Sequence, residues 1–287
     1  PIIRRLLQRL ETLQRSVQRF GEGDLSVRVS EQGQDEVADL ARQFNAAAAR
    51  IEALVKTHKS LLANASHELR SPLTRIRMGL ELMGGNQPSP AFREEILRNI
   101  AELDQLVDEI LLASRLDARE ADVGTVELVD LIGLAAEECA RVDAELDVTA
   151  VPEGLEVRGV AKLLRRALRN LLENARRYSQ GDITVVLQRH DGQAQLSVLD
   201  RGPGVPPALR ERIFEPFYRL PGASERAGGV GLGLALVRSI AQRHNGSVRC
   251  EDQPDGSGGA CFVLRPPLPS RPGTAAPAPQ REGTGAK

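Results

Sequence analysis

The sequence predicts a multidomain α and α+β protein: long coiled-coil helices, followed by an α/β two-layer sandwich. Its 287 residues exceed one ordinary domain of roughly 100–150 residues. Apolar residues recur at heptad spacing in the first third of the chain, and strand-like runs alternate with helical ones from about residue 123. Aromatic residues make up only 3%, with no Trp, so the core is expected to consist of aliphatic side chains, which suit long helical seams.

The overall charge and the cysteines exclude several classes of protein. The 38 basic and 39 acidic residues leave a net charge of −1, which argues against a nucleic-acid partner held by a general basic field. The three cysteines form no CxxC pair, so neither a disulfide framework nor a structural zinc site is expected. No run reaches the roughly 18 apolar residues of a membrane span. Because the chain begins inside a helical pattern, we expect an upstream part to be missing.

Residues 1–20 form the first predicted helix, with apolar residues at steps of 4, 3, 4 and 3. This heptad seam requires a partner helix. Gly21 and Gly23 end the helix, and residues 25–29 form a short extended connector. The seam consists of Leu6, Leu10, Leu13, Val17 and Phe20.

A second helix is predicted from an N-cap at Asp35 to about Met83. Two pairs of consecutive four-residue steps, around His58 and around Leu69, locally shift the heptad seam and relax the supercoil. We interpret His58 as a packed seam residue. The seam consists of Leu40, Phe44, Ala47, Ile51, Leu54, His58, Leu62, Ala65, Leu69, Leu73, Ile76, Leu80 and Met83.

A turn is predicted at residues 84–90, which are rich in Gly and Pro, and a return helix follows over residues 92–110. The resulting antiparallel helical hairpin carries one apolar stripe on each arm and cannot bury both stripes unaided. We therefore expect it to dimerise into a four-helix bundle.

The region after residue 123 is predicted to be an α/β two-layer sandwich with helices on one face of its sheet. Asp191-Gly192 lies between two alternating runs and predicts a hairpin turn. The composition from Pro266 onwards predicts a disordered tail. Strands are expected at 126–129, 147–151, 183–187, 194–199 and 261–264, and helices at about 130–144, 160–178 and 232–244.

His67 is the first candidate for chemistry. At about 100° per residue, the apolar stripe leaves His67 and Ser71 together on the solvent face, with Glu68 to one side. An exposed imidazole beside a carboxylate can act as a nucleophile. A lone surface histidine usually has no function, but Pro72 removes a helical hydrogen bond at a cost of about 3 kcal/mol. We take the kink expected there as functional, and interpret His190 and His244 as ordinary surface residues.

The α/β region contains four polar or glycine-rich elements. Asn170 and Asn174 share one helix face, where amides can bind Mg²⁺ and phosphate. The segment 200–204 pairs an acceptor, Asp200, with glycines that allow close backbone approach. The segment 214–219 is aromatic, and with Tyr178 its aromatic side chains, Phe214, Phe217 and Tyr218, are expected to shape a pocket.

The fourth element, residues 228–233, is a glycine-rich entry to a helix, which favours an anion site. It lacks the GK[ST] of a P-loop, and its spacing differs from the dinucleotide fingerprint. The polar stretch at 220–228 is interpreted as a mobile lid.

Together these motifs resemble those of a bacterial two-component sensor histidine kinase, in the same order and over nearly the whole chain. The segment around His67 resembles the phospho-acceptor box, and residues 1–55 resemble a HAMP signal-relay domain, a parallel coiled coil. The sequences around His67 and Phe214 are most similar to envelope-stress sensors with one periplasmic domain. Residues 170–178 resemble the N box, 200–204 and 229–233 the two glycine boxes, and 214–219 the F box.

The resemblance implies four regions: a HAMP domain at 1–55, a dimerisation and histidine phosphotransfer domain at 56–122, a catalytic ATP-binding domain at 123–267, and a tail at 268–287. It also implies a homodimer that phosphorylates a response-regulator receiver domain and binds no nucleic acid. The full protein is expected at the cell inner membrane, anchored by the missing upstream segment, with the present region cytoplasmic.

The same resemblance implies the roles in phosphoryl transfer. His67 would attack the γ-phosphoryl of ATP, with Glu68 positioning or deprotonating it, and Arg219 would stabilise the transferring group. Many relatives carry Thr or Asn at the position of Ser71, where the side chain orients a water that dephosphorylates the partner. A hydroxyl remains here, so a phosphatase activity is expected.

The implied nucleotide site is formed by five side chains and five glycines. Asn174 would hold Mg²⁺, while Asn170 and Arg177 would contact phosphates. Tyr178 would line the pocket, and Asp200 would accept a hydrogen bond from the adenine amino group. The pocket and its lid would be shaped by Gly202, Gly204, Gly229, Gly231 and Gly233.

Two alternatives remain. A gyrase- or chaperone-like ATPase places a catalytic Glu one turn before the metal-binding Asn, where this chain has Asn170, which cannot act as a general base. Glu173 points about 100° away from Asn174. A non-catalytic nucleotide-binding dimeric scaffold is disfavoured because His67, Asp200 and the glycines occur together with Asn174.

Overall fold

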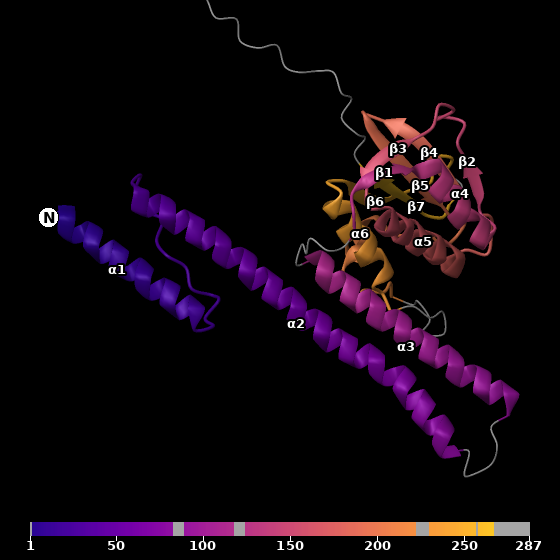
Figure 1. The fold of residues 1–287 in the computed structure, drawn as a ribbon, viewed down its shortest axis with the longest axis horizontal. Helices are drawn as coiled ribbons and strands as arrows, with labels where there is room; N and C mark the ends of the chain where they lie inside the picture. Colours follow the sequence, from indigo (N-terminus) through magenta and orange to yellow (C-terminus); the bar gives the residue numbers. More distant parts are fainter. Residues whose placement is uncertain (1, 83–88, 118–123, 222–229, 257, 267–287) are drawn as a thin grey trace, which may run out of the picture. The chain divides into compact units, whose positions relative to one another are not determined.

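The computed structural model describes residues 2–82, 89–117, 124–221, 230–256 and 258–266 (Figure 1). The predicted tail, Gly229 and most of the predicted lid and hairpin turn lie outside these residues. The chain divides into two compact units, Pro1–Ala118 and Arg119–Lys287, and each is described by itself.

The first unit consists of α1 (Ile2–Gly21), α2 (Glu36–Leu82) and α3 (Pro90–Asp117). The N-cap predicted for α2 is confirmed, since the Asp35 carboxylate accepts the Ala38 N–H at 2.9 Å. Pro72 lies inside α2, and the helix continues on both sides of it. None of these described helices is both long and apolar enough to cross a membrane.

The packing of α1 on α2 uses small residues of α2. Ala38, Ala41 and Ala48 are buried, and the rings of Phe20 and Phe44 meet edge to face at 5.7 Å. The predicted seam lies beside this buried line and remains largely exposed within the single chain. Its exposed large side chains in α1 and in the first part of α2, up to Ile51, are Leu6, Leu10, Val17, Leu40 and Ile51.

The connector between α1 and α2 is held by polar side chains. Asn45 accepts the Val29 N–H at 2.9 Å and donates to the Val29 carbonyl oxygen at 2.8 Å. Arg9 donates to the Gln32 carbonyl oxygen and forms an ion pair with Asp35. These contacts link α1, the connector and the start of α2.

The helices α2 and α3 form the predicted antiparallel hairpin. Leu61, Ala65 and Leu106 are buried between the two arms. His58 packs as expected for a seam residue, because it is half-buried and its Nε2 lies 3.0 Å from the Ser114 hydroxyl oxygen of α3. Other apolar side chains stay exposed, as expected for a hairpin that needs a partner. They are Leu62, Leu73, Leu80, Leu97, Ile100, Val107 and Leu111.

The second unit is built on a five-stranded mixed sheet with the order β2-β4-β5-β7-β6, in which only β2 and β4 are parallel. A separate pair, β1 (Glu127–Asp130) and β3 (Glu156–Gly159), is antiparallel. The five strands are β2 (Glu145–Asp147), β4 (Thr184–His190), β5 (Gln193–Leu199), β6 (Ser247–Glu251) and β7 (Cys261–Arg265). The helices are α4 (Leu131–Val142), α5 (Ala161–Tyr178) and α6 (Gly233–Arg243), with short 3-10 turns η1 (Pro207–Leu209) and η2 (Arg212–Phe214).

Several predictions for this unit are confirmed. The three helices lie where they were expected, and Asp191 and Gly192 form the β4–β5 hairpin turn with positive φ angles of 49° and 71°. The strand expected at 147–151 was misplaced: the strand ends at Asp147, whose carboxylate accepts the Thr149 N–H in a turn.

The interpretation of His244 as a surface residue was wrong. The side chain is 7% exposed and lies at the C-cap of α6. Its Nε2 accepts the Val160 N–H at 3.0 Å, and its Nδ1 lies 2.7 Å from the Ile240 carbonyl oxygen, which assigns the ring proton to Nδ1. Desolvation by burial lowers the pKa of His244. The ring therefore links the end of α6 to the start of α5.

Candidate functional site

His67 and Ser71 lie on the exposed face of α2, one helical turn apart, as the periodicity predicts. Glu68 is half-buried and engaged in an interaction of its own. Because Pro72 has no N–H, it cannot donate to the Glu68 carbonyl oxygen, the usual i−4 acceptor. The histidine is thus accessible beside a carboxylate, on a helix turn that lacks one backbone hydrogen bond.

The Ser71 hydroxyl belongs to a polar network that the sequence did not suggest. Arg75 lies 3.4 Å from the Ser71 oxygen through its Nη1 and donates through Nε to Asn99 of α3 at 2.6 Å. Its Nη2 also forms an ion pair with Glu102. Asn99 is 5% exposed, so the network anchors the surface beside His67 to the interior of the hairpin.

The helix α5 supplies the asparagines. Asn170 is buried, and its Nδ2 donates to the Gly233 carbonyl oxygen at 3.0 Å. This bond brings the glycine-rich start of α6 against α5. Asn174 lies one turn further along and is half-buried, while Arg177 and Tyr178 at the end of the helix are exposed. One amide hydrogen of Asn170 is thus used in packing α6 against α5.

Asp200 is the most buried acid of the candidate site, at 3% exposed. Its Oδ1 accepts the Gly202 N–H at 2.8 Å and the Ala260 N–H at 3.3 Å. Within the described part of the chain, its Oδ2 accepts no hydrogen bond. Desolvation raises the pKa of Asp200, an effect that these two backbone donors oppose. One carboxylate oxygen of Asp200 is therefore anchored, and the other can accept a hydrogen bond from a ligand.

The glycines permit close backbone contacts. A Cβ at Gly202 would lie 2.7 Å from the Tyr178 carbonyl oxygen, so the loop after Asp200 lies directly on the end of α5. Gly231 has φ +80°, and a Cβ there would lie 2.9 Å from the Phe217 backbone. The Phe217 N–H donates to the Gly231 carbonyl oxygen at 2.9 Å. The structure thus joins the aromatic segment 214–219 to the second glycine segment, 229–233. In the first glycine segment, Gly204 also has a positive φ angle, of +73°.

The aromatic side chains do not act as one group. Phe214 was expected to shape the pocket, but it is 2% exposed and its ring meets Phe262 of β7 edge to face at 6.3 Å. It belongs to the core. Phe217 and Tyr218 are half-buried, and the Arg212 guanidinium lies over the Tyr218 ring at 4.5 Å.

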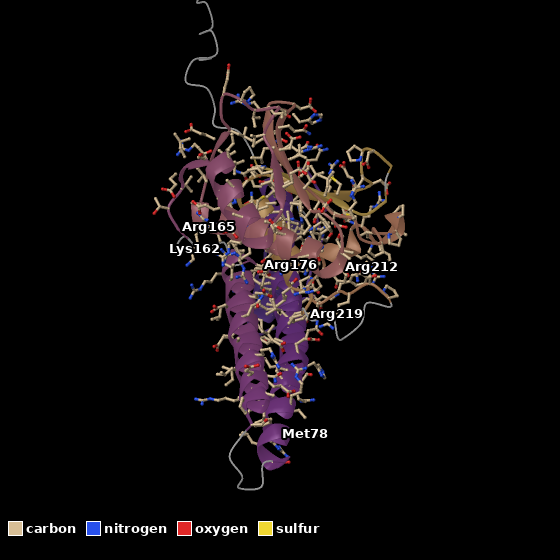
Figure 2. The ribbon with its side chains drawn as sticks, turned by 90° about the vertical axis from the view of Figure 1, so that its right-hand side faces the viewer. Met78, Lys162, Arg165, Arg176, Arg212 and Arg219 are labelled. Carbon is tan, nitrogen blue, oxygen red and sulfur yellow. The ribbon has the colours of Figure 1, made fainter. Side chains whose placement is uncertain are left out.

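Basic side chains lie on α5, in η2 and in the segment after η2. Figure 2 labels Lys162, Arg165 and Arg176 on α5, together with Arg212 and Arg219. Arg165 forms ion pairs with Glu137 and Glu138 of α4. Lys162 and Arg176 are exposed, and Arg219 is half-buried and engaged in an interaction.

Three family models match the chain in series. A HAMP domain matches residues 2–53, a His Kinase A phospho-acceptor domain matches 57–119, and the histidine kinase-, DNA gyrase B- and HSP90-like ATPase matches 159–270.

The chain is also similar in sequence to bacterial sensor proteins over most of its length. The chain is 36% identical over 262 residues to the sensor protein RstB of Escherichia coli, covering 89% of this chain and 59% of that protein. It is 35% identical over 265 residues to the histidine-protein kinase/phosphatase MprB of Mycobacterium, covering 86% and 51%. The chain thus spans just over half the length of these relatives.

The solved structure of the histidine kinase AdeS of Acinetobacter baumannii has the same fold. It is 22% identical, with a TM-score of 0.59, and the match covers 71% of this chain and 98% of that one. The fold, the three matched domains and the relatives agree: this chain belongs to the sensor histidine kinases, with a HAMP domain, a phospho-acceptor hairpin and an ATP-binding domain in series.

Proposed function

We propose that this chain phosphorylates itself on His67 from ATP and passes the phosphoryl group to an aspartate of a response-regulator receiver domain. The observation that carries the proposal is the exposed His67–Glu68 pair in a chain that also holds the ATP-binding domain with its buried Asp200. We propose the boundaries 1–55, 56–122, 123–267 and 268–287 for the four regions named above.

The proposed chemistry is an in-line displacement at phosphorus. A ring nitrogen of His67 forms the new N–P bond, the bond to the bridging oxygen breaks and ADP departs, and the proton on the other ring nitrogen passes to Glu68 or to solvent. The protein contributes mainly positioning and charge neutralisation to such a reaction. Arg219 is proposed to stabilise the transferring group.

The residues present fit a nucleotide with Mg²⁺. Asp200 offers one unengaged carboxylate oxygen to an exocyclic amine, and Gly231 lets the backbone pack closely. Asn174 offers an amide oxygen, a ligand type that Mg²⁺ accepts, and Mg²⁺ when bound would neutralise phosphate charge. Asn170 and Arg177 are proposed to contact phosphates and Tyr178 to line the pocket. Gly202, Gly204, Gly229 and Gly233 complete the proposed pocket.

A phosphatase activity is also proposed, because MprB is named a kinase/phosphatase and Ser71 places a hydroxyl one turn from His67. The hydroxyl would orient the water that hydrolyses the regulator's acyl phosphate. Ser71→Ala should lengthen the lifetime of the phosphorylated regulator, whereas Ser71→Thr should preserve it. Equal lifetimes for wild type and Ser71→Ala would contradict the phosphatase proposal.

The arrangement in the cell is proposed from the family. HAMP domains relay signals from a membrane-spanning segment, so the full protein is proposed to lie in the cell inner membrane with this region on the cytoplasmic side. The exposed apolar side chains of the hairpin support a homodimer.

Incubation with ATP labelled at the γ-phosphate tests the kinase proposal. We expect a label on the protein that is labile in acid and stable in base, present in wild type and in the surface control His190→Gln, and absent in His67→Gln. Release of free phosphate without protein label would instead indicate an ATPase, and neither label nor release would indicate a non-catalytic scaffold.

A further inference from the structure

The peptide group that joins Asp200 to Arg201 is held at both ends by side chains outside the motifs. Its carbonyl oxygen accepts a hydrogen bond from Nε2 of Gln253. Its N–H, which belongs to Arg201, donates to the Ser179 hydroxyl oxygen at 3.0 Å. On the other side of the Asp200 Cα, the Asp200 N–H donates to the Ala260 carbonyl oxygen at 3.0 Å.

These bonds determine the direction of the Asp200 side chain. A peptide group is planar, so bonds at its two ends prevent it from rotating. Because both peptide groups flanking the Asp200 Cα are held, the direction of the Cα–Cβ bond is held as well. The Gly202 and Ala260 N–H groups then anchor Oδ1, which determines where Oδ2 points.

The two side chains come from different parts of the fold. Ser179 is the C-cap of α5, in extended conformation with φ −115° and ψ 140°, and its oxygen also accepts the Gly181 N–H at 3.2 Å. Gln253 is 6% exposed and lies between β6 and β7. The carboxylate is thus held between the end of the asparagine-bearing helix and the edge strand pair of the sheet.

We propose that Ser179 and Gln253 are positioning residues that direct the Asp200 carboxylate toward the amino group of the base and so establish the preference for adenine nucleotides. This inference rests on the proposed function, in which Asp200 accepts a hydrogen bond from that amino group. Both act through the peptide group that joins Asp200 to Arg201, Gln253 at its carbonyl oxygen and Ser179 at its N–H.

The test compares ATP with purine riboside 5′-triphosphate, which lacks only the 6-amino group, on the whole chain with Mg²⁺. Wild type is expected to bind ATP about tenfold more tightly than the purine riboside triphosphate. A hydrogen bond to a charged group contributes enough free energy for a difference of this size or larger. Ser179→Val should reduce this preference to about threefold or less, and Ser179→Thr should retain it. Val and Thr have the same shape, and the extended backbone at this position suits both, so the pair isolates the hydroxyl.

Gln253→Met tests the other end of the peptide group and should also reduce the ratio of the two dissociation constants. A merely structural role would weaken both nucleotides equally and leave the ratio unchanged, which would overturn the positioning proposal. A wild-type protein that does not distinguish the two nucleotides would overturn the role of Asp200 itself, and this inference with it.

Discussion

At the scale of single residues, Asp200 is the side chain proposed to recognise the base. Gly202 and Ala260 present two N–H donors to Oδ1, so an asparagine at this position must place its oxygen there and its amino group where Oδ2 lies. The base would then meet a donor instead of an acceptor. We therefore expect Asp200→Asn to weaken ATP binding by about tenfold or more while the domain stays folded, as measured by titration calorimetry and thermal melting. Unchanged affinity would contradict the assignment.

His244 provides a second residue-scale prediction, on stability. Desolvation by burial lowers its pKa below the ordinary value of 6.5, and the neutral ring accepts the Val160 N–H. The contribution of the neutral His244 ring to the free energy of unfolding is therefore fully present above pH 6.5, the ordinary pKa of histidine. It is lost as the pH falls through the lower pKa of His244 in the folded protein. The free energy of unfolding should fall between pH 7 and pH 5, by up to about 1.4 kcal/mol per pH unit for one proton. In His244→Gln, which keeps an acceptor but does not titrate, urea melts should show a smaller fall.

At the scale of elements, α2 links the HAMP region to the phospho-acceptor hairpin as one helix of 47 residues. The heptad seam shifts near His58 and at Leu69–Leu73, where consecutive four-residue steps relax the supercoil. Inserting one residue between Leu54 and Leu62 rotates the following seam by about 100°. We expect the insertion to fix autophosphorylation at a high or a low rate. Regulation like that of wild type in a reporter strain would contradict the hypothesis that α2 transmits the signal through the phase of its seam.

The elements also show what the sequence could predict. The helices were predictable because their apolar residues recur over many turns, and the phase of α2 correctly exposed His67. The strands β3 and β6 were missed because each buries only two residues, such as Val248 and Cys250 in β6. The contacts of Ser179 and Gln253 with the Asp200 segment join residues 22 and 53 positions apart, and no periodicity reports such pairings.

At the scale of the whole molecule, the proposed dimer can be tested on two exposed residues of one helix. Leu62 is 59% exposed and lies on the predicted stripe. Met78, labelled in Figure 2, is 56% exposed. At about 100° per residue it lies about 160° around the helix from Leu62. Leu62→Glu should therefore yield monomers in sedimentation equilibrium, and Met78→Glu should remain dimeric. The reverse result, or equal effects, would contradict the predicted dimer face.

The most direct test of the account is to locate the phosphoryl group after reaction with MgATP, by mass spectrometry of peptides prepared at alkaline pH. We expect one phosphohistidine, at His67, among the four histidines of the chain. We also expect Asn174→Ala to lose this modification although His67 is still present. Phosphate found at His58, His190 or His244, or full modification of His67 in the Asn174 variant, would contradict it.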